Sequence, residues 1–140
     1  MIRRLFRRLR RNKRGAAMLE FAIAIPVLLA LIFGIIEFAW ILNGHITLTG
    51  AVREGARIAV VSNHSSKDPE DIKDEAREAV IAHAATFQLE KGDIAVDLGP
   101  YKGETTVTVG EAKLPLLVGF FPLINNPYVI KDVKATMMQE

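Results

Sequence analysis

The sequence predicts an α+β protein: a long N-terminal transmembrane helix, then a small antiparallel three-stranded sheet packed with one helix. Three observations predict this class: an apolar stretch near the N-terminus, an amphipathic segment behind a helix-start motif, and three stretches of alternating apolar and polar residues. A chain of 140 residues is long enough for a membrane segment and one small domain. We expect three regions: a basic leader (1–15), a helix (16–61) and a small α+β region (62–140).

The basic residues are concentrated at the start of the chain. The first 14 residues carry eight of the 18 Lys and Arg residues and no acid, whereas the remainder holds ten basic and 16 acidic residues. Lys and Arg that flank a membrane span stay in the cytoplasm, which predicts a cytoplasmic N-terminus and a C-terminus outside. Such a cluster also suits a nucleic-acid-binding arm, but its place beside an apolar span favours the topological role and no nucleic-acid partner.

Residues 16–42 form an apolar run that is interrupted by Glu20 and Glu37. A bilayer core of about 30 Å needs roughly 20 helical residues, which residues 21–40 supply. Backbone groups in lipid must bond to one another, so we expect a helix, with a kink or local break at Pro26 and with Trp40 at the outer interface. A cleaved signal peptide is the alternative, but its apolar region spans only about 7–15 residues before a small-residue cleavage site.

Glu20 is the residue of this run that most needs an explanation. A carboxylate at the centre of a bilayer costs about 2.5–3.5 kcal/mol on insertion scales and therefore suggests a partner. The alternative is that Glu20 lies near the headgroups and complements the positive start of the helix. The residues alone leave both interpretations open.

No residue pattern indicates an enzyme, a metal site or a cofactor. The chain has no cysteine, which excludes disulfides, thiolate metal sites and cysteine nucleophiles. The three histidines are far apart in the sequence, and no HExxH, GxSxG or phosphate-binding glycine motif is present. The acids between residues 68 and 78 lack the spacing of a calcium-binding loop.

Beyond Trp40 the helix is expected to continue to about residue 61. Ala51, Gly55 and Ala59 recur every four residues and give one flat face on which another backbone can pack closely. This face predicts either a docking surface, for the chain's own sheet or for a neighbouring helix, or ordinary internal packing. Glu54 can pair with Arg57 three residues later.

The outer region begins with a helix and continues with strands. Asp68 before Pro69 predicts the start of a helix over residues 69–88, with His83 as a packed core histidine. Residues 93–98 and 104–114 alternate around a segment with glycine and proline, which predicts a β-hairpin, and residues 128–138 predict a third strand. The apolar, proline-containing stretch 114–127 fits three places: under the sheet, on the outer bilayer surface, or against a neighbouring subunit.

Two segments resemble a known family. RGAAMLEF, residues 14–21, resembles the processing site of type IV-like prepilins of the Flp/Tad branch, although Phe21 replaces the tyrosine of many major Flp pilins. FGIIEFAWILNGHITLTGAVREGARIAV, residues 33–60, resembles TadE-like proteins, the minor pilins or pseudopilins of tight-adherence pili. The resemblance is close over residues 14–61 and loose beyond. Its most specific residues are Glu37, Phe38, Arg53, Glu54, Gly55, Ala56 and Arg57.

The resemblance implies a structural component of a Tad/Flp-type adhesive pilus. A prepilin peptidase would cut between Gly15 and Ala16 on the cytoplasmic side, and Glu20, followed by Phe21, would pair with the N-terminal amine of a neighbouring subunit. The implied partners are the lipid bilayer, the peptidase, other pilin subunits and the Tad assembly machinery. The implied location is the bacterial inner (cytoplasmic) membrane, with incorporation into an extracellular pilus left open. The alternative is an uncleaved single-pass membrane protein whose outer domain binds an unknown ligand.

Overall fold

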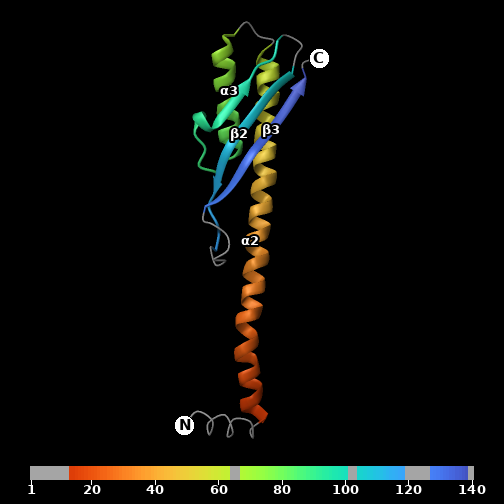
Figure 1. Cartoon of the computed structure of the whole chain (residues 1–140), viewed down its shortest axis with the longest axis vertical. Helices are drawn as coiled ribbons and strands as arrows, with labels where there is room; N and C mark the ends of the chain where they lie inside the picture. The colour runs from red at the N-terminus through yellow and green to blue at the C-terminus, as the bar shows by residue number, and fades with distance from the viewer. Residues whose placement is uncertain (1–12, 64–66, 101–103, 119–126, 139–140) are drawn as a thin grey trace. The chain divides into compact units, whose positions relative to one another are not determined.

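The computed structural model describes residues 13–63, 67–100, 104–118 and 127–138 (Figure 1). The leader residues 1–12 and part of the apolar stretch, residues 119–126, therefore lie outside the described residues. The described elements are α2 (Lys13–Ser62), α3 (Pro69–His83), the short 3-10 helix η1 (Lys91–Asp93), β1 (Ile94–Asp97), β2 (Glu104–Leu114) and β3 (Tyr128–Met138). They confirm the predicted α+β class with a long apolar N-terminal helix, a second helix and a three-stranded sheet.

The chain divides into two compact units, residues 1–36 and residues 37–140. The described part of the first unit is the apolar half of α2, and the helix continues through Pro26 without a break. Its large apolar side chains are exposed: Phe21 and Val27 are each 70% accessible. Among the described residues α2 is long and apolar enough to cross a membrane, with a mean hydropathy of 2.6 in its most apolar 18-residue window.

Helix α3 begins where the sequence predicts and ends earlier. The Oδ1 atom of Asp68 accepts a hydrogen bond from the Glu70 backbone N–H at 3.0 Å, which satisfies one of the free donors of the first turn. The helix ends at His83, five residues before the predicted end, and the Ala84 N–H donates to the Val80 carbonyl at 2.9 Å. The prediction that His83 is a core residue is wrong, because His83 is exposed and Phe87, from the turn that follows, fills the core.

The three strands form an antiparallel sheet in the order β1-β2-β3, as predicted from the alternating stretches. Val107 of β2 lies opposite Val96 of β1 and Ala135 of β3, which sets the register on the buried face. Figure 1 shows β2 and β3 as two long neighbouring strands. The burial alternation of both strands shifts by one residue between the pairs Val109–Val133 and Glu111–Lys131.

The core of the second unit lies between one face of the sheet and two helices. The second half of α2 and helix α3 both contribute, and the other face of the sheet carries the exposed side chains. The largest fully buried apolar side chains come from α2, from α3 and from the sheet: Leu48, Val52, Ile72, Val80, Ile94, Val107, Val109 and Leu114. The part of α2 beyond the apolar run is therefore an integral part of this second unit, residues 37–140, which corresponds to the region expected outside the membrane and is named the outer unit.

Candidate functional site

The candidate processing and assembly residues lie at the start of α2. The Gly15–Ala16 peptide bond lies within α2, whose described part starts at Lys13. Gly15 is half-buried, whereas Ala16 and Phe21 are exposed.

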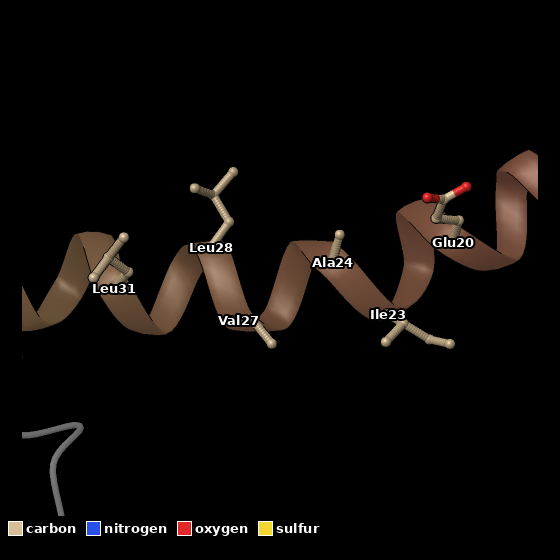
Figure 2. Close-up of a pocket in the computed structure, with 6 residues that line it drawn as sticks. All are labelled: Glu20, Ile23, Ala24, Val27, Leu28 and Leu31. Atoms are coloured by element: carbon tan, nitrogen blue, oxygen red, sulfur yellow. The ribbon is translucent and has the colours of Figure 1, made fainter.

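Glu20 is an exposed carboxylate on an otherwise apolar helix surface. It lines a shallow, open depression together with apolar side chains of the next three turns, among them Ile23 and Val27. Figure 2 shows that Glu20, Ala24 and Leu28 point to one side of the helix and that Ile23 and Val27 point to the other. Among the described residues no ion pair involves Glu20, and its side chain is exposed.

The second carboxylate of the apolar run, Glu37, has a different environment. It is only 2% accessible, and its two oxygens accept hydrogen bonds from the backbone N–H groups of Leu117 and Val118, each at 2.9 Å. Its neighbour in the family motif, Phe38, is 62% accessible. The motif thus places one side chain inside the outer unit and one on its surface.

Trp40 adds a third polar contact to the same segment. Its Nε1–H donates to the Pro115 carbonyl at 2.9 Å, so the start of the apolar stretch after β2 is fixed to α2 at both Glu37 and Trp40. The sequence identified Glu37 only through the family resemblance and did not predict these contacts. Glu37 lies 80 and 81 positions before Leu117 and Val118 in the sequence, and no local sequence pattern connects residues so far apart.

In the block of charged and small residues at 53–57, the arginines are exposed and the small residues are buried. Arg53 is exposed, and Arg57 makes a bidentate ion pair with Glu54, at 2.6 Å from Nη2 and 2.9 Å from Nε. This is the pair expected from their spacing. It lies at the surface and contributes little to stability.

The small-residue face of α2 lies in the core of the outer unit. Ala51, Gly55 and Ala59 are all buried. A Cβ atom on Gly55 would lie 2.5 Å from Val80 Cγ2 and 3.1 Å from the Ala76 carbonyl oxygen, so the glycine allows α3 to approach α2 closely. The structure therefore covers this face with the chain's own α3 and sheet.

Among the residues that the structure describes, no group of three or more His, Asp or Glu side chains is placed to hold a metal ion. The geometry that remains consists of an exposed apolar helix segment that carries Glu20, and a compact α+β unit of residues 37–140. These features are those of an α+β protein whose described residues include one helix long and apolar enough to cross a membrane.

Residues 15–57 match the family model of TadE-like proteins. The match confirms the resemblance predicted from the sequence. It begins at Gly15 and includes Glu20, Glu37 and the block at 53–57. Comparisons with curated proteins and with solved structures found no match.

Proposed function

We propose that the protein is a minor pilin or pseudopilin, a structural component in the assembly of a Tad/Flp-type adhesive pilus. In this proposal it is inserted in the bacterial inner membrane with its N-terminus in the cytoplasm, and a prepilin peptidase removes the leader after Gly15. The start of the family match at Gly15 and the basic residues before it support this arrangement. Its partners are then the peptidase, other pilin subunits and the Tad assembly machinery.

The observation that carries the proposal is the environment of Glu20. A carboxylate among exposed apolar side chains is costly in lipid unless it meets a cation. Removal of the leader creates a new α-amino group at Ala16, and the same amine on a neighbouring subunit is a suitable partner. A pilin-like assembly supplies this pairing between subunits, whereas a solitary anchor helix does not.

The mass of the mature protein tests leader removal. The purified protein is expected to begin at Ala16, because Gly15 lets the extended backbone approach a protease closely. A Gly15→Val variant is expected to accumulate with its leader attached, since the added isopropyl group obstructs that approach. Intact-mass and N-terminal peptide spectrometry of the membrane fraction measures both.

Ala17→Val is the matched control, because it adds an equivalent branched side chain two residues beyond the proposed bond. It is expected to be processed like the wild type. A Gly15→Val protein of the processed mass would show that Gly15 is not the cleavage position. A wild-type protein that retains Met1 would remove the processing proposal altogether.

An uncleaved single-pass anchor with an outer binding domain is the second candidate. The observation that favours it is the compact outer unit, residues 37–140, which has its own core of two helical segments and a sheet. The same mass measurement separates the two candidates, because only the pilin proposal requires an N-terminus at Ala16.

A further inference from the structure

The short segment that follows β2, residues 115–118, is fixed to α2 by hydrogen bonds. Two run from the backbone N–H groups of Leu117 and Val118 to the carboxylate of Glu37, and one from the Trp40 indole to the Pro115 carbonyl. All of these residues belong to the outer unit. The segment is irregular, and its position is therefore set by Glu37 and Trp40.

Glu37 and Trp40 lie at the outer end of the apolar run. A helix rises about 1.5 Å per residue, so a span that starts near residue 21 reaches about 30 Å, the thickness of the bilayer core, at Trp40. Tryptophan is enriched at this interface, where its ring is apolar and its N–H finds a partner. A segment bonded to Glu37 and Trp40 therefore lies at the level of the outer leaflet.

The hydrogen bonds of this segment suit an environment with little water. Irregular backbone at membrane depth is tolerated only where protein groups satisfy its N–H and C=O groups. Glu37 supplies one oxygen to each of two consecutive amides, and these two donors also compensate the buried carboxylate.

The side chains of the segment are apolar and exposed. Leu117 is 59% accessible and Val118 40%, and on α2 the neighbouring positions Phe38 and Leu42 are 62% and 48% accessible. These exposed apolar positions all belong to the unit of residues 37–140.

We infer that residues 115–118 form a second membrane contact, in which Leu117 and Val118 insert among the lipids of the outer leaflet while Glu37 holds their backbone. The occupant of this apolar surface is lipid, because the segment is hydrogen-bonded to Glu37 and Trp40, which lie at the outer end of the span expected over residues 21–40. The inference rests on the membrane span and does not depend on leader removal, so it can fail or succeed separately from the proposed function.

Spin labelling of the full chain tests the inference. The chain has no cysteine, so Leu117→Cys provides a single attachment point for a nitroxide. In vesicles of phosphatidylethanolamine and phosphatidylglycerol, at high lipid dilution, the label is expected to collide several-fold more with oxygen, which concentrates in lipid, than with a water-soluble nickel chelate. Glu104→Cys, exposed at the opposite end of β2, is the control and is expected to show the reverse preference.

A label at position 117 with the same water-like profile as the label at 104 overturns the inference. A preference for oxygen that disappears on lipid dilution also overturns it, since the surface would then be covered by another copy of the chain.

The role of Glu37 is tested with Glu37→Ala in the Leu117→Cys background. Loss of both acceptors is expected to raise label mobility and shift its collisions toward the nickel chelate, whereas Glu37→Gln, which retains one carbonyl oxygen, is expected to have a smaller effect. A label at Ile32, in the middle of the apolar run, monitors insertion of the helix and is expected to be unchanged. An unaltered profile at position 117 in Glu37→Ala would contradict the role of Glu37.

Discussion

Gly50 and Gly55 lie five residues apart on α2 and have different surroundings. A Cβ atom at Gly50 would meet no other atom within 4 Å, whereas at Gly55 it would lie 2.5 Å from Val80 Cγ2 and 3.1 Å from the Ala76 carbonyl oxygen. The side chain of Val80 has some freedom to move, but the backbone of α3 does not move without disturbing the core. Position 50 therefore has room for a side chain, whereas the close packing of α3 on α2 requires glycine at position 55.

Gly55→Ala is expected to lower the free energy of unfolding by about 1–3 kcal/mol through overpacking. Gly50→Ala, the control on the same helix, is expected to raise it by roughly 0.5–1 kcal/mol, because alanine loses less backbone freedom on folding. Thermal or denaturant unfolding of the detergent-solubilised chain, followed by circular dichroism, measures both changes. Equal effects of the two substitutions would contradict the close packing of α3 on Gly55.

Single residues also mark the limits of prediction from the sequence. Asp132 has a positive φ of 54°, a conformation that aspartate tolerates better than most residues, and it lies where the burial alternation of β3 shifts. The alternating pattern predicts the strand and its inner residues Val133, Ala135 and Met137, but not this local irregularity. The alternating pattern also does not predict the hydrogen bonds between Glu37 and the segment after β2, because these bonds join residues 80 and 81 positions apart.

Among the elements, the three strands could be predicted to within one residue at each end, because period-two alternation is a strong local signal. Helix α3 was predicted correctly at its start, where Asp68 and Pro69 act locally. Its end was not, because the alanine-rich residues that follow have a high helix propensity. Tertiary packing of Phe87 and Leu89 against the core prevails over that propensity, so the chain turns away after His83.

Helix α3 carries several ion pairs that make its stability depend on pH. Hydrogen bonds from Arg77 and then Lys91 lower the pKa of Asp74, and hydrogen bonds from Lys67 and then Ser62 lower the pKa of Glu75. A carboxyl group whose pKa is lowered by folding contributes stability above its ordinary pKa, near 4, and that contribution is lost as the pH falls through the folded value. Acid should therefore weaken the attachment of α3.

The unfolding temperature is expected to fall as the pH is lowered below about 5, where the unfolded chain begins to bind protons that the folded chain does not. Asp74→Asn should show a smaller fall over the same range, because one of the shifted groups is gone. Since all these groups are exposed, added salt should reduce the difference. Thermal unfolding curves recorded across the pH range provide the measurement, and parallel curves for variant and wild type would contradict the assignment.

At the scale of the whole molecule, the division into compact units follows packing rather than secondary structure. The sequence suggests regions at 1–15, 16–61 and 62–140, with a boundary where α2 ends. The boundary between the two compact units lies between residues 36 and 37, inside α2, and Leu48, Val52 and Ala56 belong to the core shared with α3 and the sheet. One helix thus exposes apolar side chains over its first half and contributes to the core over its second.

The two acids of the apolar run differ in the same way, and this difference allows the assembly role to be tested. Glu37 has its partners inside the outer unit, so its loss should affect folding of that unit, whereas Glu20 is exposed and should matter only when subunits meet. Glu20→Ala is expected to leave the unfolding temperature unchanged and membrane insertion intact or eased, since a charge is removed from lipid. Incorporation into pili is expected to fall several-fold.

Glu20→Gln should be as defective as Glu20→Ala, because it keeps the size of the side chain but not the charge that attracts an amine. Ile23→Ala, an exposed position of the same helix, is the control for a loss of apolar surface and should assemble like the wild type. Immunoblots of sheared pili and of the membrane fraction compare assembled with inserted protein. Wild-type amounts of pili in both Glu20 variants would remove the charge pairing, and with it the physical reason for placing an acid on a lipid-facing helix.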